Sequence, residues 1–415
     1  MSNKRYKVKK DKPIFNTRKQ GSSLLGIIIM VILLAALVFV GYSVGKPILE
    51  YFSGESDSPS SQQGDMPSVT DRTDATTPVS TGSEDETDRT EQEEEEPEVA
   101  PVRKNILYIS YPQDVVFSAS YESMILSRLE SEDMSGYYGV CIDLVLDGGE
   151  VTYQSENTTA IESGAVIAGG ISDLKMIADA IREAGLVPYA RVSALSDHIV
   201  SWYDKSTSYM FENSDSRWLD NTAASGGKPW LSPFSNSSRE YMNAICSEIS
   251  EAGFVGMIAG ELEFPPFRST DLNYIGQSVK DENRYTALVD FSSGMRESFG
   301  EGNEFYIEVS ARDIIAGSDE ILTAPDSLPT DTVYVRFDPD EIGVRVSKED
   351  GGEVSFEGLN EVYLLKAVFM RVNDSLEGSG LNIIPLISGV ELTDDFYDML
   401  NEIGYSDSLV IISQN

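Results

Sequence analysis

Acidic and basic side chains recur at the ends of short apolar segments, where a parallel sheet would bring them together. The set comprises Asp143, Asp147, Arg191, Glu261, Glu263, Glu308, Arg312, Asp313, Arg336 and Asp338. Paired carboxylates can serve as a general acid and its partner base or nucleophile, and arginines can hold polar groups of a substrate. Each residue alone fits a structural ion pair at least as well, but several together indicate a site.

Aromatic residues form the second candidate group. Residues 195–237 contain all three tryptophans, Trp202, Trp218 and Trp230, together with Asp220. Flat aromatic faces beside carboxylates suit a sugar ring, which has apolar C–H faces and a rim of hydroxyls. We therefore take Trp218, Asp220 and Trp230, with the arginines, as candidate substrate-binding residues. The alternative is a small satellite core that fixes this long segment.

Several other chemistries have too few residues to support them. The chain has one histidine, His198, and two cysteines, Cys141 and Cys246. A histidine-based triad would have to use His198, and a zinc site would need carboxylates to complete it. The two cysteines could pair with each other, but two scattered cysteines in apolar runs do not make a disulfide framework.

No cofactor is expected from the motifs. The sequence has no Walker-type glycine loop and no GxGxxG after a strand. Its acidic residues could hold calcium, but no EF-hand spacing supports such a site.

The overall charge argues against a nucleic-acid partner. The 415 residues include 69 Asp or Glu and 31 Lys or Arg, for a formal net charge of −38. Binding to phosphates requires clustered cations, and the main basic cluster here is a short run at the extreme N-terminus.

Strand-like and helical patterns alternate along residues 102–415. Apolar strand candidates occupy residues 106–111, 139–146, 186–192, 255–262, 305–310, 332–337, 383–387 and 409–412. Helical periodicity occurs at residues 121–132, 173–184, 238–252, 284–298, 359–372 and 394–403, with a weak segment around Glu320. This order is typical of an α/β fold with a parallel sheet, and eight units predict a closed (β/α)8 TIM barrel. Sites in such barrels lie at the C-terminal ends of the strands, where the polar residues above fall.

The first 45 residues predict a membrane anchor. Residues 1–20 carry eight cations and one acid, and residues 21–45 have no charged side chain. The apolar run is long enough to cross a bilayer, and the positive flank keeps the N-terminus in the cytoplasm. A cleaved signal peptide is the alternative, but the run is too long and no clear cleavage site follows. We expect a single-pass cell-membrane protein with an extracytoplasmic C-terminal domain.

Residues 46–101 are predicted to be a disordered acidic linker. They are rich in Ser, Thr, Asp, Glu, Gln, Gly and Pro and end in a run of glutamates. Such a segment cannot bury a core, and like charges extend it. A role as an acidic interaction tail is the alternative.

Several ordered motifs between residues 140 and 265 resemble a known family. They are VCIDLVLDGGEVTY at 140–153, ISDLK at 171–175, RWLDN at 217–221, WLSPF at 230–234, and GF at 253–254 followed by EFP at 263–265. These motifs resemble the putative glycosyl hydrolase domain family of bacterial TIM barrels. The resemblance is tightest over residues 139–267, and it implies a glycoside-hydrolase-like barrel that acts on or binds polysaccharide.

The sequence departs from the family pattern at the positions that the resemblance would make catalytic. The family motif Phe-Asp-Tyr-x-Arg-Phe-Pro falls on AGELEFP at 259–265, so Gly260 replaces an aspartate and Glu261 and Glu263 replace tyrosine and arginine. A second expected aspartate is Arg312, unless a one-residue slip brings in Asp313, and the family's aromatic, histidine-bearing segment is replaced by RFDP at 336–339.

The departures leave three hypotheses open. In the first, the protein is a glycoside hydrolase with Glu261 or Glu263 as the acid and Asp147 or Glu308 as its partner, since two flanking carboxyls are required. Alternate strand residues face opposite sides, so Glu261 can take the place of an aspartate at 260 only if the strand end bends. The second is an inactive carbohydrate-binding barrel, and the third is an envelope scaffold that presents a protein-binding surface.

Overall fold

The computed structural model describes residues 105–118, 120–131, 133–388, 393–405 and 411–413. The predicted basic tail (1–20), the predicted transmembrane helix (21–45) and the predicted acidic linker (46–101) all lie outside these residues. Within the described residues, no helix has both the length and the apolar character needed to cross a bilayer.

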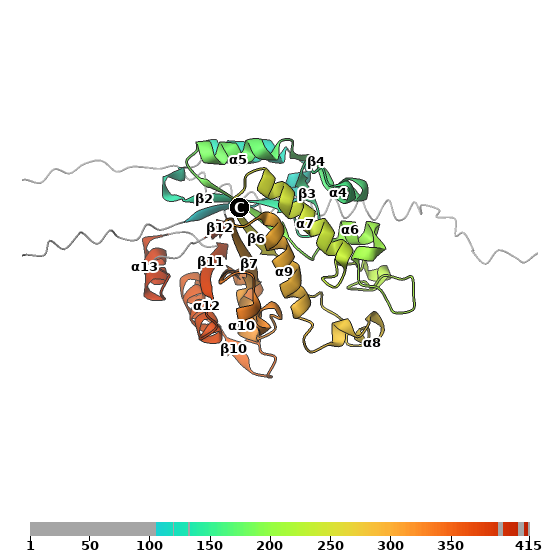
Figure 1. The fold of residues 1–415 in the computed structure, drawn as a ribbon. Coiled ribbons are helices and arrows are strands. Elements are labelled where there is room, and N and C mark those ends of the chain that lie inside the picture. The colour runs from blue at the N-terminus through green and yellow to red at the C-terminus, as the bar shows by residue number, and fades with distance from the viewer. Residues whose placement is uncertain (1–104, 119, 132, 389–392, 406–410, 414–415) are drawn as a thin grey trace, which may run out of the picture. The chain divides into compact units, whose positions relative to one another are not determined.

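Eight parallel strands close into a barrel. They are β1 (Ile106–Ile109), β2 (Gly139–Val145), β5 (Val187–Ser193), β6 (Gly256–Gly260), β7 (Glu304–Ser310), β8 (Thr332–Phe337), β11 (Asn382–Ser388) and β12 (Ile411–Ser413). Each pairs in parallel with its neighbours, and β1 pairs with both β2 and β12, which closes the ring. The eight strand candidates from the sequence are these eight strands, and the expected α/β barrel is present (Figure 1).

Helices surround the barrel, as Figure 1 shows. The six expected ones are α3 (Tyr121–Ser131), α5 (Leu174–Glu183), α7 (Asn236–Glu251), α9 (Thr286–Phe299), α12 (Glu361–Leu376) and α13 (Asp394–Glu402). In α5, Leu174, Ile177, Ala178 and Ile181 are buried at helical spacing, and the Asp173 side chain accepts a hydrogen bond from the Met176 backbone to begin the helix.

The weak segment between β7 and β8 has no long helix. It contains α10 (Ala311–Ala316), which ends at Gly317 in the left-handed region, and two 3-10 turns at Ile321–Thr323 and Pro325–Ser327. Other short elements are α2 (Gln113–Ser118), α6 (His198–Tyr203), α8 (Leu272–Ile275) and α11 (Pro339–Ile342), with a hairpin of β9 (Arg345–Ser347) and β10 (Glu353–Ser355).

An unexpected excursion separates β2 from β5. It consists of β3 (Val151–Tyr153), α4 (Thr158–Ser163) and β4 (Val166–Ile171). Strand β3 pairs antiparallel with β2 and β4 pairs parallel with β3, so the two strands extend the sheet outside the ring. Glu248 on α7 holds the excursion by accepting hydrogen bonds from Tyr153 Oη (2.8 Å), Ser155 Oγ (2.6 Å) and the Glu156 backbone (2.9 Å).

Tyrosines fill much of the barrel interior. Buried Tyr108, Tyr189 and Tyr334 pack there with aliphatic residues and Cys141. Tyr189 lies beside two glycines on the neighbouring strands, and a Cβ at Gly256 would approach its ring to 2.0 Å. The small residues therefore make room for the ring. Cys246 lies instead in the core outside the ring, and both cysteines are free.

Candidate active site

A cavity of about 260 Å³ opens where seven of the barrel strands end. Its walls contain Tyr108, Ser110, Tyr111, Gln113, Asp143, Leu146, Asp147, Arg191, Glu261, Glu308, Arg336, Leu386 and Ser388. Six of the residues selected from sequence therefore meet in one cavity, namely Asp143, Asp147, Arg191, Glu261, Glu308 and Arg336. Its polar walls and its position at the C-terminal face are those of a binding or catalytic site in a barrel.

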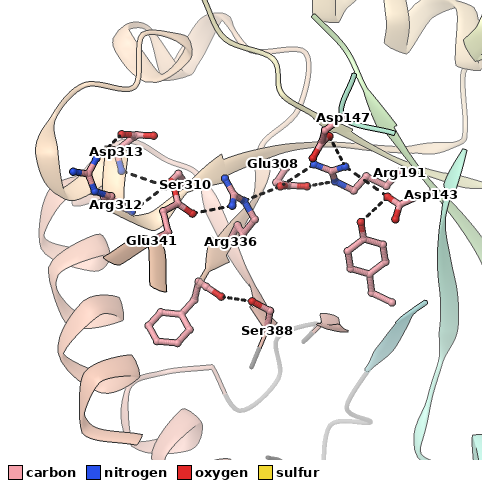
Figure 2. A network of polar contacts seen from close by, with 12 residues as sticks. Asp143, Asp147, Arg191, Glu308, Ser310, Arg312, Asp313, Arg336, Glu341 and Ser388 are labelled. Atoms are coloured by element: carbon pink, nitrogen blue, oxygen red, sulfur yellow. Dashed lines mark hydrogen bonds and ion pairs between the residues drawn. The ribbon is translucent and has the colours of Figure 1, made fainter. Parts of the chain in front are cut away.

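Arg191 is the centre of the polar network in this cavity (Figure 2). Its Nε donates to Glu308 Oε2 at 2.6 Å, its Nη2 to Glu308 Oε1 at 3.3 Å, and its Nη1 to Asp147 Oδ1 at 3.0 Å. Asp143 Oδ1 lies 3.6 Å from Nη1. The Arg191 side chain is only 7% exposed, so these carboxylates compensate a charge that water does not reach.

Glu308 is bound by two arginines. In addition to Arg191, Arg336 Nε lies 3.0 Å from Glu308 Oε1, and Arg336 Nη1 forms a second ion pair with Glu341 at 2.8 Å. The Glu308 side chain is buried. Both of its oxygens are occupied, which suits a positioning role better than attack on a substrate.

Asp143 is held by three neighbours. Tyr108 Oη donates to its Oδ1 at 2.6 Å and Ser110 Oγ to its Oδ2 at 2.8 Å, both from the end of β1. Burial raises the pKa of Asp143, and Arg191 and the two hydrogen bonds partly offset the rise. The sequence analysis identified Asp143 but missed Tyr108, Ser110 and Ser388. Ser110 and Ser388 lie at the ends of the first and seventh expected strands, so the rule that sites lie at strand ends could have found them.

Glu261 reaches the cavity because the chain bends sharply after β6. The strand ends at Gly260, and Glu261 has a φ of +50°, in the left-handed region that few residues other than glycine adopt. Backbone hydrogen bonds from Ala194 to the Gly260 carbonyl (2.8 Å) and from Leu195 to the Glu261 carbonyl (3.1 Å) hold this bend. The bend that the sequence argument required is present, and such local strain is common at functional sites.

The surroundings of Glu261 favour its protonated form. Burial, followed by the nearby charge of Asp147, raises its pKa to about 7, and Arg191 opposes the rise. A carboxyl with a pKa near 7 can donate a proton at neutral pH.

Gly260 has no side chain, and the Arg191 guanidinium occupies the space where a Cβ would lie. A Cβ at Gly260 would lie 2.6 Å from Arg191 Nη2 and 2.8 Å from its Cζ. The glycine at this position, where the resemblance implies an aspartate, therefore permits the approach of Arg191 to Glu308.

Glu263 lines a smaller cavity with Glu261, Glu308, Asp319 and Arg336. Burial raises its pKa to about 8, with the charge of Glu261 as the next cause. Glu263 is nevertheless exposed by surface area, so solvent screens these charges and we assign no chemical step to it. Among the described residues, no three His, Cys, Asp or Glu side chains are grouped to hold a metal ion.

The other predicted binding residues lie outside both cavities. Trp218 is fully buried in a hydrophobic cluster with Tyr209, Trp230 and Val279, and its Nε1 donates to Asp271 at 2.9 Å. Trp230 Nε1 donates to Asp220 at 3.2 Å. These residues form a small satellite core, the alternative to the expected sugar-binding surface. The buried Trp218 has no free face for a sugar.

Arg312 also lies away from the cavity. Its guanidinium is 3.9 Å from Asp313, and its side chain is exposed (Figure 2).

Trp218→Phe should lower the free energy of unfolding by about 1–3 kcal/mol, because the buried Nε1–Asp271 hydrogen bond and part of the ring are lost. Trp202→Phe is the matched control, since Trp202 is 58% exposed. Urea denaturation of the two variants measures the difference. Equal stability of the two variants would show that Trp218 does not support the loop.

Residues 115–316 match the family described as "Putative glycosyl hydrolase domain". The resemblance seen in the sequence is confirmed. The matched segment contains Asp143, Asp147, Arg191, Glu261 and Glu308, whereas Arg336 lies beyond it. No curated protein matches the chain.

Several solved structures are similar to the chain. A hypothetical protein from Ruminiclostridium thermocellum ATCC 27405 is 16% identical, with a TM-score of 0.38, covering 49% of this chain and 96% of that one. The PgaB (BpsB) glycoside hydrolase domain from Bordetella bronchiseptica is 12% identical (TM-score 0.49; 74% and 93% covered). The PelA glycoside hydrolase domain from Pseudomonas aeruginosa is 12% identical (TM-score 0.37; 75% and 95% covered).

Proposed function

We propose that the protein is a glycoside hydrolase that cleaves a polysaccharide of the cell wall or the extracellular matrix. The observation that carries the proposal is Glu261, which a left-handed bend places in a polar cavity next to Asp147 and whose pKa is near 7. The family match supports the reaction class.

Glu261 is the proton donor in this proposal, and Asp147 is its partner. The Asp147 side chain is 55% exposed, and Arg191 binds its Oδ1. Among the residues that the structure describes, Oδ2 has no ion pair. Glu308 has both oxygens bound by arginines and keeps Arg191 in place. The family's aspartate at 260 is thus replaced by a carboxyl one residue later in the chain.

The chemistry needs only these two carboxyls. Glu261 gives its proton to the glycosidic oxygen as the bond from that oxygen to the anomeric carbon breaks. Asp147 either attacks the anomeric carbon or takes a proton from the water that does so, according to the separation of the two carboxyls around the bound sugar. In the first case water then hydrolyses the covalent intermediate, and Glu261 takes up the proton from that water.

The test is release of reducing ends by the full chain in detergent, from isolated cell walls and a panel of soluble polysaccharides. We expect release from at least one substrate by the wild type and by Glu301→Gln, which changes an exposed glutamate outside the cavity. No release by the folded wild type from any substrate would contradict hydrolysis.

Glycan binding without cleavage is the second candidate function. It is supported by Gly260 and Arg191, because the position of the family's aspartate has no carboxyl and a guanidinium lies against it. Retention of the wild-type protein on a polysaccharide in affinity electrophoresis, with no reducing ends released, would favour this function.

We also propose that residues 21–45 anchor the protein in the cell membrane, with the barrel outside the cytoplasm. The uncharged run and its basic N-terminal flank support this arrangement. The full chain should stay with carbonate-washed membranes, and protease added to intact cells should cleave its C-terminal part.

Lysine at both Ile28 and Val31 should release the protein from the membrane, because each cation costs about 2.5–3.5 kcal/mol at the centre of a span. A double leucine variant at the same positions is the control. Membrane retention of the double lysine variant would contradict the anchor.

A further inference from the structure

We propose that Trp202 is the stacking platform of a second sugar subsite, so that the protein binds a chain of several sugars rather than a single unit. This inference rests on the proposed glycan-binding function of the first cavity. It names a residue and a cavity that the first site does not include.

The second cavity adjoins the first. It has a volume of about 290 Å³ and shares Gln113 and Asp147 with the first cavity. Its other walls are Gly148, Glu150, His198, Ile199, Trp202, Gly227, Lys228 and Pro229. A glycan whose scissile bond lies at Asp147 therefore has space for a further sugar on the side of Trp202.

Trp202 differs from the other two tryptophans because its ring is largely in solvent. The residue is 58% exposed, whereas Trp218 and Trp230 are buried. The exposed indole leaves an apolar ring face available for contact with a sugar. The Arg217 guanidinium, 5.8 Å from the ring centre, is the neighbour that helps to orient the indole.

The backbone fixes Trp202 relative to Asp147. Trp202 lies on α6, and Asp197 begins this helix by accepting hydrogen bonds from the Ile199 and Val200 backbones at 2.9 and 2.8 Å. Gly148, which follows Asp147, is hydrogen-bonded to the start of this helix. Its backbone N–H donates to the Ser196 carbonyl (2.8 Å), and its carbonyl accepts from the His198 backbone N–H (2.9 Å). These backbone bonds fix the position of α6, and so of Trp202, relative to Asp147.

His198 gives the subsite a hydrogen-bond acceptor. Its Nδ1 lies 2.8 Å from the Pro229 carbonyl, which can only accept, so Nδ1 carries the proton. Burial lowers the pKa of His198, and the ring is neutral at pH 7. Nε2 is then the lone-pair nitrogen that can accept from a sugar hydroxyl.

The charges in the second cavity suit a neutral sugar. Lys228 offers hydrogen-bond donors. Burial raises the pKa of Glu150, and the charge of Lys228 partly offsets this rise. An apolar ring face, a neutral acceptor and a hydrogen-bond donor match a pyranose with hydroxyl groups.

The experiment measures binding in the Glu261→Gln background, where the probes are not consumed. The probes are cellohexaose, xylohexaose, maltohexaose, isomaltohexaose and chitohexaose, with the corresponding disaccharides. We expect one hexasaccharide to protect tryptophan fluorescence from iodide, and Trp202→Ala to abolish this protection and weaken hexasaccharide binding about tenfold. Disaccharide affinity and thermal unfolding should not change.

Tyr274→Ala is the matched control, since Tyr274 is an exposed aromatic residue outside both cavities. Unchanged hexasaccharide binding by Trp202→Ala, or the absence of protection by every hexasaccharide, would overturn the subsite. Cleavage is scored separately with the wild type. Binding that depends on Trp202 without any cleavage would keep the subsite and reject hydrolysis.

Discussion

Arg191→Met should lower the free energy of unfolding by about 3–5 kcal/mol at pH 8, because it leaves buried carboxylates without their cation. Asp143 loses its ion pair with Arg191, while Glu308 keeps Arg336. Methionine fills a similar volume, so the loss measures charge compensation more than packing. Urea denaturation, followed by circular dichroism, gives the change.

The loss should be smaller at pH 5 than at pH 8. The pKa of Asp143 is already raised by burial in the wild type, and removal of Arg191 raises it further. A carboxyl whose pKa is higher in the folded state binds more protons there, so stability falls as pH rises from its unfolded towards its folded pKa. The interval between the unfolded and folded pKa of Asp143 is wider in the variant, so its stability falls further as the pH rises.

Arg312→Met is the matched control, because Arg312 is exposed and its ion pair is long at 3.9 Å. Its effect should stay within about 1 kcal/mol. Equal losses for the two variants, or a loss for Arg191→Met that does not depend on pH, would contradict the assigned network.

Glu261→Gln should reduce the rate of reducing-end release by about 10²–10⁴-fold, the range typical of a lost general acid. The glutamine keeps the size of the side chain but has no proton to donate to the leaving oxygen. The wild-type rate should fall as pH rises above about 7, where Glu261 loses its proton. A wild-type rate that stays level up to pH 9, or a variant as active as the wild type, would assign the acid to another group.

Glu261→Gln should lower the reaction rate but raise the free energy of unfolding at pH 8. The folded pKa of Glu261 is about 7, above its ordinary value of 4.5, so deprotonation between these values destabilises the folded wild type. Glu261→Gln removes this cost. The variant should therefore be more stable than the wild type at pH 8, and the difference should disappear near pH 4.

The strands and long helices were predictable from sequence because each has a strong local pattern. Leu174, Ile177, Ala178 and Ile181 show the helical spacing that buries one face of α5. The continuous apolar run of β2 has the pattern of a strand covered on both sides. The rule that sites in barrels lie at the C-terminal ends of strands then predicted, from sequence, that Arg191, Glu261 and Glu308 share one site.

The parts that sequence did not predict depend on contacts between distant residues. Strand β3 has three residues, and its place is set by pairing with β2 and by the Glu248 carboxylate on α7, 95 residues from Tyr153. Trp218 and Trp202 have the same side chain in the same loop, yet one is buried and the other exposed. Their environments depend on how the loop folds over Phe267 and Asp271, which residue type does not reveal.

The cavity is complete only when the pairing of β1 with β12 has closed the barrel. Strand β1 meets the last strand, with Ile106 paired to Ile411, and the end of β1 supplies the Tyr108 and Ser110 hydroxyls that hold Asp143. This join has the longest sequence separation of any in the barrel, and such contacts are slow to form. The cavity has walls on both sides of this join, because β1 and the residue after it supply Tyr108 and Ser110, and β11 supplies Leu386 and Ser388. The complete cavity therefore forms only after the two ends of the domain have come together.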